Sequence, residues 1–181
     1  MLNNILRQSN TKWLFALVII SEILIYFLCL QELSQEVSPY QLMARYSARV
    51  SFVIFVVLYG WIAWVGLKRI FQATKSRDLL VAFLLAFAVN HIIHLGFLSY
   101  NYWLQPFPLS VVQHGGGAIA YLVLSILPLW LAQVQQLTTR RYYSLHLALF
   151  FIWIFFNQSY MGRYLHGLDW GSAAWVYGSF F

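Results

Sequence analysis

Hydrophobic residues are gathered into five long stretches, and short segments between them hold most of the charge. The stretches cover residues 13–30, 47–67, 79–103, 115–134 and 143–160. A helix needs about 20 mostly apolar residues to cross a bilayer, and each stretch is close to that length. None alternates between apolar and polar residues as a barrel strand does, so helices are predicted. We expect an all-α, polytopic membrane helical bundle with five spanning helices.

The remaining C-terminal part, residues 161–181, is short, aromatic and rich in glycine. It fits either a short sixth helix or an interfacial segment, and the preference of Trp and Tyr for the headgroup level favours the second. Neither a linker nor an internal repeat divides the sequence, so residues 1–181 are expected to form a single transmembrane domain. Pro128 is expected to kink the fourth helix.

The composition supports a membrane protein and narrows its chemistry. Only 9% of the residues are charged, whereas a soluble domain has about 25%. The net charge of +6 would suggest nucleic-acid binding in a soluble protein. Here the basic residues lie between apolar stretches, where they set orientation, so no nucleic-acid partner is expected. Cys29 is the sole cysteine, which excludes an internal disulfide and a cysteine-based zinc or iron–sulfur site.

Orientation follows from the distribution of Lys and Arg. Basic residues collect before the first stretch, after the second and before the fifth: Arg7, Lys12, Lys68, Arg69, Lys75, Arg77, Arg140 and Arg141. With alternating spans these three segments share one side, which the positive-inside rule makes cytoplasmic. We therefore expect a cytoplasmic N-terminus in a bacterial inner membrane, with the tail on the outer side.

The histidines divide into an outer group and one cytoplasmic residue. The third stretch runs outward from residue 79, so His91 lies about 18 Å along it and His94 about 4.5 Å further. Because they are three residues apart, they share a face. His114 opens the fourth helix and His166 follows the fifth, both on the outer side. His146 lies about one turn into the fifth helix from the cytoplasmic end.

Ionisable residues inside a membrane are costly and usually face the interior of the bundle. A ligand role for the histidines competes with interhelical hydrogen bonding, or with an interfacial position for His114 and His166. Glu22 also needs a partner, and either an ion pair with Arg49 or a carboxyl kept protonated by burial would satisfy it. The functional alternative is that Glu22 belongs to a proton path. The glycines at 115–117 allow a neighbouring helix or a flat cofactor to approach closely, and helix packing is the commoner reason.

Several stretches resemble the ferric-reductase-like transmembrane family, including the haem-binding membrane subunits of bacterial methionine sulfoxide reductase systems. RDLLVAFLLAFAVNH at 77–91 is similar to the family's third helix, with a basic start and a terminal histidine. GAIAYLVLSILPLWLA at 117–132 resembles the fourth helix, and RRYYSLHLALFFIWIFF at 140–156 the fifth, with its Leu-His pair. ARYSARVSF at 44–52 resembles the start of the second helix more loosely. Together these stretches cover about half of the chain in the family's order.

The resemblance implies that His91 and His146 bind haem. The family commonly has another histidine further along the fifth helix, where this chain has Asn157, Gln158 and Ser159. A haem with two histidine ligands needs them at similar depth, but His91 and His146 differ in depth by about 12 Å or more. The replacement ligands would then be outer histidines: His94, His114 or His166.

Three functions follow. The first is a membrane-embedded electron-transfer protein, and thus a possible oxidoreductase subunit, with b-type haem. It would take electrons from quinol or a partner redox protein and pass them to an outer-side acceptor. The second is a non-haem protein whose outer histidines bind a transition metal such as Cu, Zn or Fe: His91, His94, His114 and His166. The third is a structural or assembly subunit of a larger membrane complex, in which the histidines only hydrogen-bond between helices.

Overall fold

The computed structural model describes residues 9–31, 38–106 and 111–169. Within these ranges all regular structure is helical. The helices are α2 (Ser9–Gln31), α3 (Pro39–Val65), α4 (Leu67–Gln72), α5 (Thr74–Leu104), α6 (Val111–Gln133) and α7 (Thr139–Asp169). The all-α fold predicted from the apolar stretches is confirmed.

Four helices are long and apolar enough to cross a membrane: Thr11–Gln31, Pro39–Val65, Thr74–Leu104 and Gly115–Gln133. They correspond to the first four predicted stretches. The fifth stretch lies in α7, whose apolar sequence is interrupted by His146, Asn157 and Gln158. The described residues therefore support an integral membrane bundle with four spans, and the fifth span stays a prediction.

The predicted boundary between the fifth helix and a separate tail at residue 160 is wrong. α7 continues through that point as far as Asp169. A glycine inside a helix costs only about 1 kcal/mol relative to Ala, so Gly162 and Gly167 do not have to end it. The preference of aromatic residues for the headgroup level concerns depth, and it does not terminate a helix. The rest of the expected tail, 170–181, lies outside the described residues.

The basic segment after α3 contains a short helix that the hydrophobic pattern did not reveal. Gly66 ends α3 in a left-handed conformation, with φ 83°, and its N–H donates to the carbonyl of Ile62 at 2.8 Å. A residue without a Cβ adopts this conformation at little cost. α4 then buries Leu67 and Ile70, while Lys68 stays exposed. The chain reverses here into α5.

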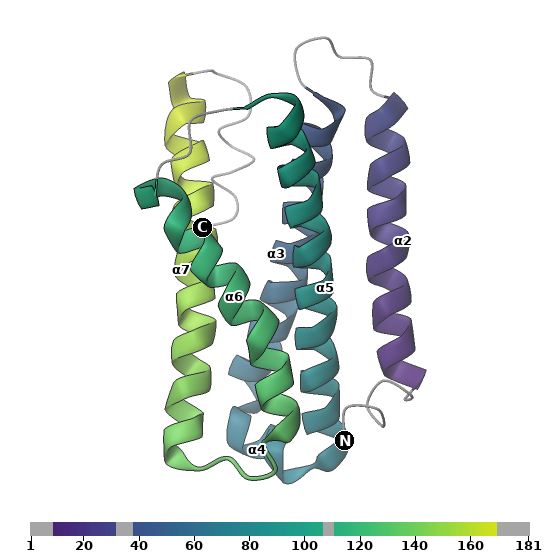
Figure 1. Cartoon of the computed structure of the whole chain (residues 1–181). Coiled ribbons are helices and arrows are strands. Elements are labelled where there is room, and N and C mark those ends of the chain that lie inside the picture. Colours follow the sequence, from purple (N-terminus) through teal and green to yellow (C-terminus); the bar gives the residue numbers. More distant parts are fainter. Residues whose placement is uncertain (1–8, 32–37, 107–110, 170–181) are drawn as a thin grey trace.

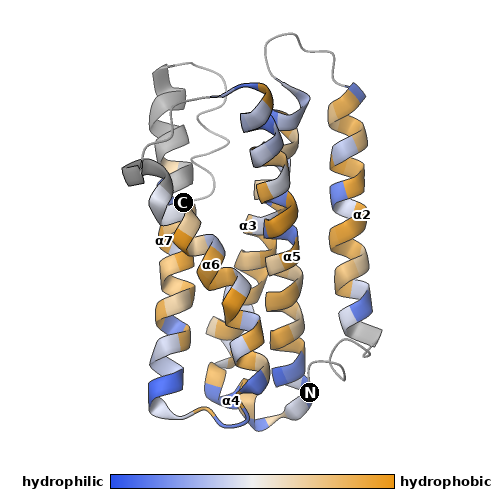
Figure 2. Cartoon of the chain, viewed as in Figure 1, coloured by the Kyte–Doolittle hydropathy of each residue, from blue (hydrophilic) through white to orange (hydrophobic). Residues whose placement is uncertain are grey.

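The long helices run side by side, with α2 at one edge and α7 at the other (Figure 1). α2 packs on α3 and α5, and α7 packs on α6. The core between α3, α5 and α7 is aromatic, because the ring centroid of Phe156 lies 5.4 Å from that of Phe55 and 6.0 Å from that of Phe87. Figure 2 shows apolar residues along the lengths of the helices, and many of them, including Trp64, are exposed on the outside of the bundle. A surface of this kind suits lipid.

α6 approaches α7 closely at one glycine. A Cβ placed on Gly116 would overlap the ring of Phe155, whereas a Cβ on Gly117 would meet nothing within 4 Å. The expectation of close helix approach is confirmed at Gly116, whereas no described helix comes close to Gly117. Small residues let membrane helices gain van der Waals contact where they cross.

Gly116→Ala should therefore destabilise the protein and Gly117→Ala should not. Alanine favours a helix over glycine by about 1 kcal/mol at both positions. Only at Gly116 must the Phe155 ring move, and overpacking of this kind costs about 1–3 kcal/mol. Apparent melting temperatures in detergent measure the difference. Equal melting temperatures would mean that the α6–α7 contact is not tight at Gly116.

Candidate functional site

Five side chains from three helices form a polar cluster inside the bundle. Its members are Glu22 of α2, Ser47 and Ser51 of α3, and Asn90 and His91 of α5. All are buried except His91, which is half-buried. Polar groups at membrane depth must find partners within the protein, so a cluster of this kind fixes how the helices meet.

The donors in the polar cluster can be assigned one after another. Ser47 Oγ donates to Glu22 Oε1 at 2.9 Å, and the Asn90 amide donates to the same oxygen. Ser51 Oγ donates to Asn90 Oδ1, and this bond uses the single hydrogen of the Ser51 hydroxyl. The Ser51 oxygen can then only accept from His91 Nδ1, which lies 3.1 Å away. This network gives His91 its proton on Nδ1 and leaves Nε2 as an acceptor.

The predicted ion pair between Glu22 and Arg49 is wrong. The guanidinium of Arg49 lies 4.9 Å from the centroid of the Tyr46 ring. Ser47 occupies the face of α3 that meets α2, and residues two apart on a helix do not share a face. Among the described residues the ion pair joins Arg77 to Asp78, at 3.2 Å.

His91 and His94 lie together, as their spacing predicted. Their ring centroids are 5.6 Å apart, and the ring of Tyr121 on α6 lies 4.5 Å from His91 and 6.3 Å from His94. No group of three or more His, Cys, Asp or Glu residues suited to a metal occurs in the described part of the chain. Any further ligand has to come from another residue type, such as Tyr121, or from side chains outside that part. His114 and His166 belong to α6 and α7, but their side chains lie outside the described residues.

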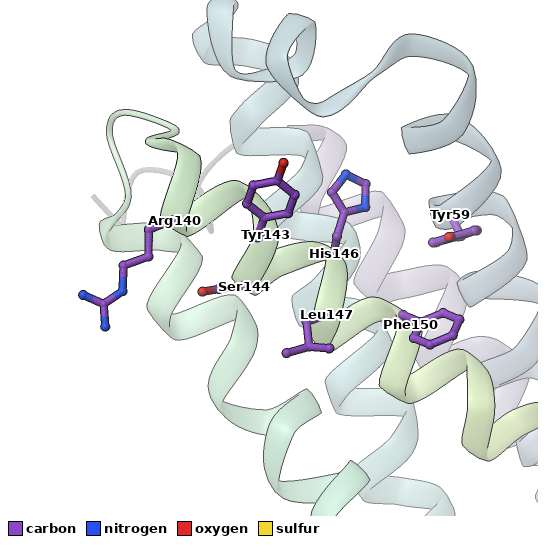
Figure 3. A pocket seen from close by; sticks show the side chains of 7 residues that line it. All are labelled: Tyr59, Arg140, Tyr143, Ser144, His146, Leu147 and Phe150. Atoms are coloured by element: carbon purple, nitrogen blue, oxygen red, sulfur yellow. The ribbon is translucent and has the colours of Figure 1, made fainter.

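His146 lies elsewhere, in a pocket of about 680 Å³ between α7 and α3. Figure 3 shows His146 of α7 and Tyr59 of α3 on its two sides, with Arg140 at the far edge. The lining residues are Tyr59, Arg140, Tyr143, Ser144, His146, Leu147 and Phe150. Tyr143 and Leu147 are largely exposed, so the pocket opens to the outside of the bundle.

The ring of His146 is not tied into the bundle by hydrogen bonds. Its described contact is with the ring of Tyr142, one turn earlier on the same helix, at 4.5 Å between centroids. Neither ring nitrogen has a hydrogen-bond partner among the described residues, whereas Nδ1 of His91 is engaged by Ser51. Interhelical hydrogen bonding thus accounts for the position of His91 and does not account for that of His146.

The two histidines singled out by the family resemblance are not brought together. α5 and α7 begin at the same end of the bundle (Figure 1). His91 lies about 26 Å along α5 and His146 about 10 Å along α7, by the helical rise. Aromatic rings occupy the space between them. Tyr59, in the pocket, stacks on Phe55 at 5.7 Å, Phe55 contacts Phe156 at 5.4 Å, and Phe156 contacts His91 at 5.9 Å.

The pocket contains residue types that could hold a haem. His146 could supply a nitrogen ligand, and the rings of Tyr59 and Phe150 would supply apolar surface. Arg140 and Ser144 add a cation and a hydroxyl at the edge of the pocket, of the types that bind carboxylates, and in Figure 3 both groups are directed away from His146. The volume falls within the range of about 300–1,000 Å³ typical of ligand pockets.

Sequence reasoning missed Ser47, Ser51 and Tyr59. Ser47 and Ser51 are four residues apart, which places both on one face of α3. That spacing could have predicted a polar face on α3 before the structure was known. Tyr59 could not be found in this way, because only the approach of α3 and α7 brings it opposite His146.

Comparison of the chain with protein-family models, with curated proteins and with solved structures gives no match. The resemblance to the ferric-reductase-like family therefore stays a prediction based on the motifs quoted above. Inferences about the site depend on the geometry of the chain itself.

Asn90→Ala should lower the free energy of unfolding by about 1–3 kcal/mol, because Ser51 and Glu22 each lose one of their two buried hydrogen-bond partners. Asn157→Ala is the control, since among the described residues that amide bonds only to the Trp153 carbonyl of its own helix. Its effect should stay within about 0.5 kcal/mol. Unfolding in mixed micelles measures both variants. An Asn90→Ala protein as stable as the control would show that the polar cluster contributes nothing to stability.

Proposed function

We propose that the protein is a membrane-embedded electron-transfer protein that binds b-type haem in the pocket between α3 and α7, with His146 as axial ligand. The observation that carries the proposal is a histidine without a hydrogen-bond partner among the described residues, lining a pocket of about 680 Å³. The pocket is lined by residue types that suit each part of a haem: a nitrogen ligand for the iron, aromatic rings for the faces of the porphyrin, and polar groups for the propionates. The resemblance in the stretch 140–156 points to the same histidine.

Bound haem would supply a centre that accepts and releases one electron. The chain's own residues hold and tune that centre. α7 carries His146 into the pocket, and the ring of Tyr142 packs against the imidazole and restricts its rotation. Arg140 offsets negative charge at the pocket's edge. The rings of Tyr59 and Phe150 would give the bound group an apolar wall on the side of the bundle.

The position of the pocket is compatible with a donor on the cytoplasmic side or in the bilayer. It lies near the end of the bundle that carries the basic segments, which the positive-inside rule makes cytoplasmic in a bacterial inner membrane. Its open side admits a donor, either quinol from the bilayer or a partner redox protein. The acceptor that we propose is on the outer side, so a partner would have to supply a further redox centre between it and the pocket.

Transition-metal binding at His91 and His94 is the second candidate function. The closeness of their rings, 5.6 Å between centroids, favours it, as does an Nε2 of His91 that is free to act as a ligand while Ser51 holds Nδ1. Elemental analysis of the purified protein separates this candidate from haem binding. A protein with neither haem nor metal would be the structural subunit of a larger membrane complex.

The purified protein should show a b-type reduced-minus-oxidised spectrum, and His146→Ala should lose most of the haem, because the axial ligand is removed. Leu129→Ala changes an exposed residue of α6 outside the pocket and should retain it. His91→Ala should also retain it, because His91 lies outside the pocket. Absorbance and haem-to-protein stoichiometry in detergent provide the measurement. Loss of haem in His91→Ala but not in His146→Ala would reject the pocket as the haem site.

We also propose that α7 is a fifth span, which places the segment after it on the outer side. Cysteines introduced by Gln136→Cys, between α6 and α7, and by Ser172→Cys, in a background of Cys29→Ala, test this. A membrane-impermeant maleimide should label the protein in intact cells only at position 172. Labelling of both positions, or of neither, would contradict a fifth span.

A further inference from the structure

We propose that Glu22 is a proton-binding site in the membrane interior and that the polar cluster links it to His91. The proposal does not depend on haem binding. It starts from the place of Glu22 in α2, about 20 Å from the start of a helix that is about 35 Å long by the helical rise. Glu22 thus lies near mid-depth, and it is only 4% exposed.

The hydrogen bonds to Glu22 are unevenly shared between its two oxygens. Ser47 and Asn90 both donate to Oε1. Oε2 is buried and has no hydrogen-bond partner among the described residues. A neutral carboxyl matches this pattern, because its carbonyl oxygen accepts while the other oxygen carries the proton.

A carboxylate would not match it. The negative charge would be shared with an oxygen that receives no donor, in a part of the bundle where no described cation contacts it. Arg49 on α3 lies over Tyr46, and Arg77 on α5 is paired with Asp78. An unpaired charge inside a membrane is far more costly than one unsatisfied neutral hydroxyl.

The polar cluster connects this proton to one other titratable group. Of the titratable side chains on α3 and α5, the helices against which α2 packs, the described hydrogen bonds join only His91 to Glu22. Each donor points toward Glu22: His91 to Ser51, Ser51 to Asn90, and Asn90 to Glu22. If the proton leaves, these aligned donors stabilise the remaining charge, and a change of charge at His91 reaches Glu22 through them.

Infrared spectroscopy tests the proposal directly, because the chain contains only five Asp and Glu residues. In lipid nanodiscs at neutral pH the protein should show a protonated carboxyl C=O band that shifts in D₂O. Glu22→Gln should abolish it, and Asp78→Asn, which changes the ion-paired buried acid, should not. Labelling the wild-type protein with ¹³C-carboxyl glutamate should also shift the band, so the assignment does not depend on the variant folding.

Ser51→Ala tests the link to His91. It removes the donor to Asn90, so the band should persist at a changed frequency. Ser125→Ala is the matched control and should leave the frequency unchanged, because the hydrogen bond described for that hydroxyl goes to the Tyr121 carbonyl of its own helix. An unchanged band in Ser51→Ala would overturn the link.

The absence of a protonated band, its survival in Glu22→Gln, or its loss on adding Na⁺ at constant pH would overturn the proton site. Haem content bears on none of these outcomes.

Discussion

The hydrogen bonds that Glu22 receives from Ser47 and Asn90 define how α2 joins the bundle. Most of the apolar surface of α2 is exposed, as Leu24 and Phe27 illustrate. Apolar contact alone gives such a helix little preference for protein over lipid, because lipid tails are as apolar as leucine. A carboxyl that must be satisfied inside the bundle supplies that preference. It fixes both the rotation and the depth of α2 against α3 and α5.

The same constraint sets the orientation of His91. Asn90 is turned toward Glu22 and Ser51, and Ser51 is thereby committed as an acceptor for the imidazole. On its other side the ring of His91 contacts Tyr121, Phe87 and Phe156. A residue that resembles a haem ligand by its sequence context is thus held in a network that serves helix packing as well.

His146 differs from His91 in that no described hydrogen bond orients its ring. Its ring is not engaged by hydrogen bonds in the described part of the chain, and α3 and α7 leave a pocket beside it. The aromatic core that includes Phe55 and Phe156 separates this pocket from His91. Two chemically different sites therefore share one bundle, a closed polar cluster between α2, α3 and α5 and an open pocket between α3 and α7.

The sequence by itself determined the all-helical membrane character, the first four spans and the shared face of His91 and His94. These depend on local quantities: the length of apolar stretches, the rise of a helix and the spacing of residues along it. Tertiary structure decided what each polar side chain meets. It gave Glu22 the partners Ser47 and Asn90 in place of Arg49, carried α7 past residue 160, and set Tyr59 opposite His146. The rotation of each helix about its axis is fixed only when the helices pack, so these partners could not be read from spacing along a single helix.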